Sequence, residues 1–153
     1  MPLFRPQLHA NLTDVTSDQH HARAHDHSSA LDGATLSPAG GVNFSSQISP
    51  AALTASVNDY NPNGGDTAFI WHLTTNGSNW NITGIVAPAV AGAMHWIANT
   101  HATANITLVH ASASSAAANR LNLPNLTNII IGPYDSVLLV YSGQLGRWRA
   151  LGT

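Results

Sequence analysis

From residue 51 onward, the chain is a series of short apolar runs separated by turn-forming residues. The runs are rich in Val, Ile, Leu, Trp and Thr, and Asn, Gly or Pro interrupts them at intervals of about ten residues. Within them, large apolar side chains such as Phe69, Trp71 and Leu73 occupy every second position, which is typical of β-strands. We therefore predict strands over residues 53–60, 67–75, 79–86, 93–99, 105–110, 119–123, 127–131, 136–142 and 145–151.

Turn residues between these runs favour antiparallel pairing. The NGSN segment at 76–79 lies between two predicted strands, as the turn of a β-hairpin does, and NPNGGD at 61–66 supplies Pro and Gly for a tight change of direction. The segment ASASSAAANR at 111–120 has no large apolar residue with which a helix could pack, so we predict a close-packed loop there. No internal repeat of fixed period is visible.

Both faces of several predicted strands carry apolar side chains. A lone antiparallel sheet usually leaves one face polar, so we expect the second face to meet a neighbouring chain. The predicted fold is all-β, with an antiparallel β-sandwich or jelly-roll-like domain over residues 51–153 and an extended N-terminal arm over residues 1–50. The arm holds five of the nine His and few adjacent large apolar residues, so it cannot bury enough surface to fold alone.

Composition excludes several classes of function. Only 8% of the residues are charged, the net charge is -2, and the chain lacks Lys and Glu. No basic stripe is available to neutralise phosphates, so nucleic acid is not an expected partner. The opening residues lack the pattern of a secretory signal, and no apolar run reaches the roughly 18 residues of a transmembrane helix, so no membrane partner is expected either.

The reactive residues point away from an enzyme. The chain has no G-x-S-x-G motif and no P-loop, and the absence of lysine removes Schiff-base chemistry. Asp59, Asp66 and Asp135 stand in turn contexts, where a carboxylate accepts backbone N–H bonds rather than facing a second acid across a cleft. We predict no catalytic residue and no cofactor other than a possible metal ion.

Four histidines gather in HHARAHDH at 20–27. His21 and His25 have the spacing of one helix face, whereas His25 and His27 point to one side of an extended strand, which the segment HDHSSALDG favours. One chain then supplies two ligands, and three chains around a three-fold axis would supply six, enough for an octahedral transition-metal site. The alternative is that these histidines are neutral and hydrogen-bond to backbone. The remaining histidines of the β-domain are expected in the core or at an interface: His72, His95, His101 and His110.

Two parts of the sequence resemble structural proteins of tailed bacteriophages. The stretch LTDVTSDQHHARAHDHSSALDGATLSP looks like the His-rich linkers of such proteins. The stretch from LTASVNDYNPNG through ASASSAAANRLNLP to GPYDSVLLVYSGQLGRWRALG is similar to small β-domains of phage tail fibres and head-associated fibres. This resemblance implies a homotrimer. It also implies that His25 and His27 ligate a metal on the three-fold axis, as H-x-H pairs do in some fibres.

The function expected from these observations is that of a virion structural protein. Residues 1–50 would attach to the major capsid protein or to other virion proteins, and the β-domain over 51–153 would trimerise and project. Because one compact domain directly follows the arm, a short capsid decoration protein or head fibre is favoured over a long tail fibre. The alternative is a tail-fibre or receptor-binding tip protein that stacks a host glycan on one of four tryptophans: Trp71, Trp80, Trp96 or Trp148.

Overall fold

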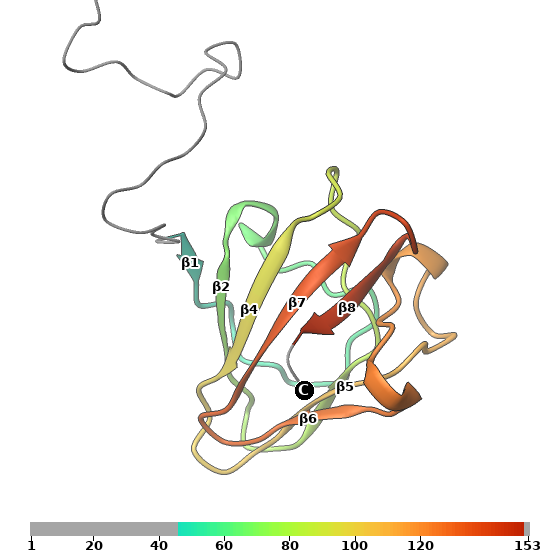
Figure 1. Cartoon of the computed structure of the whole chain (residues 1–153). Coiled ribbons are helices and arrows are strands. Elements are labelled where there is room, and N and C mark those ends of the chain that lie inside the picture. The colour runs from blue at the N-terminus through green and yellow to red at the C-terminus, as the bar shows by residue number, and fades with distance from the viewer. Residues whose placement is uncertain (1–45, 152–153) are drawn as a thin grey trace, which may run out of the picture. The chain divides into compact units, whose positions relative to one another are not determined.

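The computed structural model describes residues 46–151, and Figure 1 shows how their strands are arranged. This part is mostly β, which confirms the predicted fold class at that level. Its helical elements are the 3₁₀ turns η3 (Gly65–Thr67), η4 (Ala117–Asn119) and η5 (Pro124–Leu126), and no helix here has the length and apolar character that crossing a membrane requires. The strands are β1 (Gln47–Ile48), β2 (Ile70–Leu73), β3 (Trp80–Ile82), β4 (Met94–Asn99), β5 (Ile106–Leu108), β6 (Ile129–Ile131), β7 (Ser136–Ser142) and β8 (Arg147–Leu151).

The strands form two sheets. The larger sheet has the order β1-β2-β4-β7-β8, and the smaller sheet has the order β3-β5-β6. In the larger sheet β1, β2 and β4 are parallel, whereas β7 is antiparallel to β4 and β8 is antiparallel to β7. In the smaller sheet β3 and β5 are parallel and β6 is antiparallel to β5. The predicted antiparallel arrangement is therefore wrong for half of these strand pairs.

The NGSN segment shows why this prediction is wrong. It does not close a hairpin, because it leads from β2 in the larger sheet to β3 in the smaller sheet. The side-chain oxygen of Asn76 accepts hydrogen bonds from the Ser78 backbone N–H at 3.3 Å and from Trp80 Nε1 at 2.9 Å. Turn residues thus specify a local change of direction. They do not specify whether the next strand returns to the same sheet.

Segments that follow each other along the chain lie side by side as parallel strands. In the larger sheet Ile70 pairs with Trp96, a shift of 26 residues, and β3 and β5 pair with the same shift in the smaller sheet. Asn79 and Asn105 are equivalent under this shift, and Asn79 Oδ1 accepts the Asn105 backbone N–H at 2.8 Å. A structural repeat therefore exists where no sequence repeat was visible, because few identical residues recur at that spacing.

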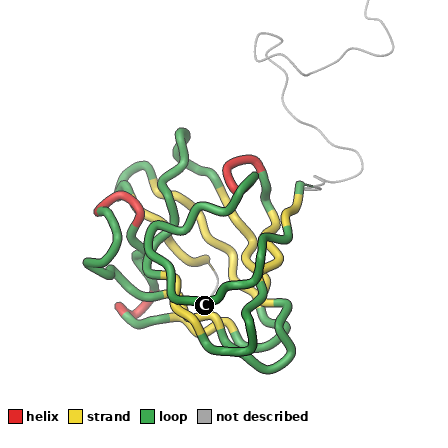
Figure 2. Tube along the Cα trace, turned by 180° about the vertical axis from the view of Figure 1, so that it is seen from behind, coloured by secondary structure: helices red, strands yellow, loops and turns green. Residues whose placement is uncertain are grey.

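The core lies on the inner sides of the two sheets. Alternate residues of β4 and β7 are buried there, including Ile97 and Leu139, as the alternation of apolar residues predicts. Trp71 and Trp148 are the largest fully buried side chains. Figure 2, seen from behind, shows that loops make up much of the opposite side of the molecule.

Residues 111–120 form a loop, as predicted, and it packs closely against the domain at one residue. The loop contains η4, and its Ser115 is buried. Gly84 allows this approach, because a Cβ atom at that position would lie 2.5 Å from Ser115 Oγ and 2.7 Å from the Asn119 carbonyl oxygen. Any larger residue at position 84 would force the loop away from the sheet.

Three details differ from the predicted strand pattern. Residues 53–60 and 119–123 make isolated β-bridges rather than strands. In addition, β1 lies within the predicted arm and pairs with β2. The β-domain therefore begins before residue 50, and the predicted boundary between residues 50 and 51 is too late. A strand of two residues is too short to show an alternating pattern that could be recognised in the sequence.

Candidate interaction surface

Two of the three aspartates of the β-domain accept backbone N–H bonds, as predicted. Asp59 Oδ1 accepts the Ala116 backbone N–H at 3.1 Å, and Asp135 Oδ1 accepts the Ser136 backbone N–H at 2.7 Å. Asp66 is exposed in the first turn of η3. The carboxylates of Asp59 and Asp135 are therefore engaged in holding backbone conformation.

Two histidines act in the same way. His101 Nδ1 accepts the backbone N–H groups of Thr103 at 3.1 Å and Ala104 at 2.9 Å. His110 Nδ1 accepts the Leu123 backbone N–H at 3.1 Å. Because Nδ1 of each ring already accepts backbone hydrogen bonds, neither His101 nor His110 has this nitrogen available to a ligand.

The predicted metal ligands, His25 and His27, lie outside the described residues. Within residues 46–151, no group of three or more His, Cys, Asp or Glu side chains could hold a metal ion.

His95 lies in the core between two tryptophans. Its ring centroid is 4.2 Å from that of Trp71 and 4.8 Å from that of Trp148, and its Nδ1 lies 3.0 Å from the Ala68 carbonyl oxygen. Burial lowers the pKa of His95, because desolvation disfavours the imidazolium form; the bond to Ala68 and the charge of Asp66 act in the opposite direction. The ring is therefore a neutral element of the core.

The four tryptophans differ sharply in exposure. Trp71 and Trp148 are 2% and 0% exposed, so neither can stack on a sugar. Trp80 is half-buried and donates its Nε1–H to Asn76. Trp96 is 46% exposed. Of the four candidates for glycan stacking, Trp96 thus offers the most open indole ring.

Trp96 lies within an apolar row that crosses the outer side of the larger sheet. In the strand register, Ile70 of β2, Trp96 of β4, Leu138 of β7 and Leu151 of β8 are successive neighbours. Their neighbours within these strands are buried in the core, so the row itself points away from the core. Leu151 is 45% exposed, like Trp96. The larger sheet therefore carries an apolar row on its outer side in addition to its buried inner side.

Polar residues border this row. Met94 and Val140 form the next cross-strand pair and extend the apolar surface, and Arg149 on β8 follows Val140 in register. At the β1 edge, His72 Nε2 lies 3.1 Å from Gln47 Oε1. An apolar centre with a polar rim is the usual anatomy of a protein–protein interface. We call the apolar row together with Met94 and Val140 the outer apolar face.

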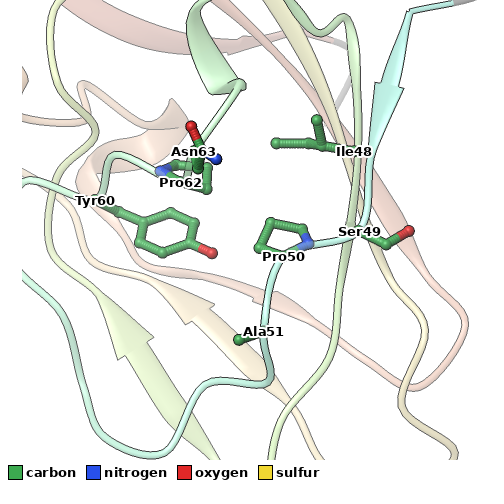
Figure 3. A pocket seen from close by; sticks show the side chains of 7 residues that line it. All are labelled: Ile48, Ser49, Pro50, Ala51, Tyr60, Pro62 and Asn63. Atoms are coloured by element: carbon green, nitrogen blue, oxygen red, sulfur yellow. The ribbon is translucent and has the colours of Figure 1, made fainter.

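A separate cavity of about 510 Å³ lies between residues of the segment from Ile48 to Asn63 (Figure 3). Figure 3 shows the Tyr60 hydroxyl directed toward Pro50, and burial raises the pKa of Tyr60. The lining contains no carboxylate, imidazole or basic side chain, so it holds no acid–base pair. Its residues are Ile48, Ser49, Pro50, Ala51, Tyr60, Pro62 and Asn63.

No protein-family model, curated protein or solved structure matches this chain. Function must therefore be inferred from the residues themselves. Among the described residues, the outer apolar face brings together apolar side chains of four neighbouring strands, of which Trp96 and Leu151 are exposed and the others are half-buried. It is the strongest candidate for a functional surface in this part of the chain.

Proposed function

We propose that this chain is a virion structural protein of a tailed bacteriophage, a short trimeric decoration protein or head fibre anchored to the capsid. Residues before the β-domain attach to the major capsid protein or to another virion protein. The β-domain, a sandwich-like unit of two sheets, trimerises and projects. The partners of the chain are thus protein surfaces, and its location is the virion. The resemblance of residues 12–38 and of the β-domain to phage structural proteins supports this proposal.

The observation that carries the proposal is the outer apolar face. A small polar substrate is bound by convergent polar groups, whereas this face exposes Trp96 and Leu151 beside the half-buried Ile70 and Leu138. Several titratable groups that could serve catalysis, such as Asp59, His95 and His110, are engaged in the fold. A non-enzymatic chain that works through contact with other proteins fits this distribution of side chains.

The alternative is a receptor-binding tip that binds host glycans. The exposed indole ring of Trp96 favours it, because sugars stack on such rings. The register neighbours of Trp96, however, are Ile70 and Leu138, which offer no hydrogen bonds to sugar hydroxyls. A glycan would leave its hydroxyl groups unpaired there, and this disfavours the alternative.

Attachment to particles tests the proposal. Deletion of residues 1–45 leaves every described strand intact, including β1 at Gln47–Ile48. We expect the truncated protein to remain folded by circular dichroism and to lose co-sedimentation with phage particles that lack their own copy. Cryo-electron microscopy of particles with the full chain should show trimeric density on the capsid. Full decoration by the truncated protein would contradict the assigned role of the N-terminal segment.

A further inference from the structure

We propose that Asn63 is a site of spontaneous covalent modification, at which the side-chain amide is lost and an aspartate or isoaspartate forms. The inference goes beyond the proposed function and does not depend on it. It rests on a comparison of the two Asn–Gly dipeptides that the sequence contains, Asn63–Gly64 and Asn76–Gly77. The fold leaves the first dipeptide able to react and protects the second.

An asparagine that precedes glycine can react with its own backbone. The glycine nitrogen attacks Cγ of the asparagine, so that a C–N bond closes a succinimide ring and the Cγ–Nδ2 bond breaks. The proton of the backbone N–H leaves with the amide nitrogen as ammonia. Water then opens the ring at either carbonyl carbon and yields aspartate or isoaspartate. Glycine favours the attack because it has no Cβ atom beside the nitrogen.

The peptide group between Asn63 and Gly64 is exposed and unpaired within the described part of the chain. Both residues are exposed to solvent. No described residue hydrogen-bonds to the Asn63 side chain, to the Asn63 carbonyl oxygen or to the Gly64 N–H. Ring closure requires this peptide group to rotate until its nitrogen meets Cγ. That rotation breaks none of its own hydrogen bonds.

The turn around this peptide group is held at its ends. The Gly65 N–H donates to the Pro62 carbonyl oxygen at 2.8 Å, and both of these residues are buried. Gly64 has φ 78° and ψ 2°, as the third residue of a type II turn does. Glycine adopts positive and negative φ about equally well, so Gly64 can follow the rotation without steric strain. The central peptide group can therefore turn while the ends of the turn stay in place.

The second dipeptide is equally exposed but is hydrogen-bonded. Asn76 Oδ1 accepts the Trp80 Nε1–H at 2.9 Å and the Ser78 backbone N–H at 3.3 Å, which fixes the side-chain amide. The Gly77 N–H donates to Oγ1 of the buried Thr75 at 3.2 Å. The attack requires this N–H to lose its proton, and the bond to Thr75 is then lost. The fold thus opposes at Asn76 the reaction that it permits at Asn63.

Modification of Asn63 changes the cavity shown in Figure 3. Asn63 is part of its lining, which contains no carboxylate. The reaction places a negative charge there, and isoaspartate also adds a methylene group to the backbone of the turn. The described residues contain three Asp and three Arg and no Lys or Glu, so their formal charges cancel before the reaction. Afterwards this part of the chain carries a net negative charge.

Incubation of the full wild-type chain at mildly alkaline pH tests the assignment, because every molecule contains both sites. Peptide mapping by mass spectrometry follows the replacement of the amide by a hydroxyl group at each asparagine. We expect conversion at Asn63 to be at least about tenfold faster than at Asn76, the factor expected where one reaction must break one or two additional hydrogen bonds. In the urea-unfolded chain, which lacks these bonds, the ratio of the two rates should fall toward one.

Two variants remove the protection at Asn76. Thr75→Val keeps the shape of the side chain and removes the acceptor of the Gly77 N–H, and Trp80→Phe removes the donor to Asn76 Oδ1. Each should raise conversion at Asn76 about fivefold, as for the loss of one hydrogen bond, and leave Asn63 unchanged. Asn63→Gln, with a longer side chain that closes a less favourable ring, should abolish the reaction at position 63 only. Circular dichroism verifies folding.

The wild-type comparison decides the inference even where a variant fails to fold. An intact Asn63 after prolonged incubation, or equal conversion of both asparagines in the folded protein, overturns it. A ratio that persists in urea also overturns it, because the flanking sequence and not the fold would then set the difference. Faster conversion at Asn63 in the folded protein alone supports the inference, whatever the outcome of the particle-attachment experiment.

Discussion

Both sides of the five-stranded sheet carry Trp and His side chains, but those on the inner side lie in the core and those on the outer side do not. On the inner side, Trp148 and His95 stack in the core, and no buried side-chain nitrogen or oxygen atom of the described residues lacks a hydrogen-bond partner. On the outer side, Trp96 is exposed and His72 contacts Gln47 at the rim. Burial within one chain is thus complete on the inner side and incomplete on the outer side. The same substitution made once on the inner side and once at an outer position can therefore separate effects on folding stability from effects on contact between copies.

The largest expected difference is between the two tryptophans. Trp148→Ala should lower the free energy of unfolding by about 3–5 kcal/mol, because it opens a cavity in the core and removes the Nε1–H donor of the Ile85 carbonyl oxygen. Trp96→Ala should lower it by less than about 1 kcal/mol. Urea unfolding at a protein concentration too low for assembly provides the measurement. Equal losses for the two variants would break the distinction between the two sides.

A pair of asparagines gives a smaller difference. Asn99 is buried, and its Nδ2 donates to the carbonyl oxygens of Ala104, Ile131 and Gly132 at 2.8–3.0 Å. Asn99→Ala leaves these acceptors without that donor and should cost about 1–3 kcal/mol in unfolding free energy. Asn81→Ala, on the outer side of the smaller sheet, should change it by no more than about 0.5 kcal/mol. A loss at position 81 as large as at position 99 would show that the outer side also contributes to the fold.

The smallest effect concerns the two histidines and appears only in acid. Because the pKa of His95 is lowered in the folded state, the unfolded chain binds its proton first as pH falls below about 6.5. Stability should be unaffected by this group above that pH and should decline below it, by at most about 1.4 kcal/mol per pH unit. Urea unfolding at pH 7.5 and pH 5.5 measures the change. His95→Phe should reduce the acid sensitivity, whereas His72→Phe should retain it.

Sequence alone predicted strand positions better than strand partners. The predicted strand at 136–142 coincides with β7, and that at 93–99 is within one residue of β4, because alternating apolar residues are a local signal. Strand pairing depends on which sheet the chain enters after each turn, and a turn sequence such as NGSN does not specify that sheet. The outer apolar face could not be assembled from sequence for the same reason, since its row aligns residues of four strands only through their register.

The tryptophans show that burial of a single side chain is also difficult to predict from its neighbours in sequence. Trp148 lies between Arg147 and Arg149 in sequence and is fully buried, whereas Trp96 follows His95, precedes Ile97 and is exposed. Local hydrophobicity would assign them in reverse. Because neighbours in a strand point to opposite sides, the flanking residues describe the environment across the sheet and not that of the indole ring itself.

The place of β7 in the larger sheet has a consequence for biosynthesis. β7 lies between β4 and β8, and in the described residues β7 and β8 are the paired strands joined by a short turn, from Ser142 to Arg147. Pairings between distant segments form slowly, because loop closure comes before the contacts that reward it. While the chain is being translated, β1, β2 and β4 leave the ribosome before the strand that completes their sheet. Completion of the larger sheet therefore waits until β7 and β8 have been synthesised, and until then the earlier strands lack the partner that β7 provides for β4.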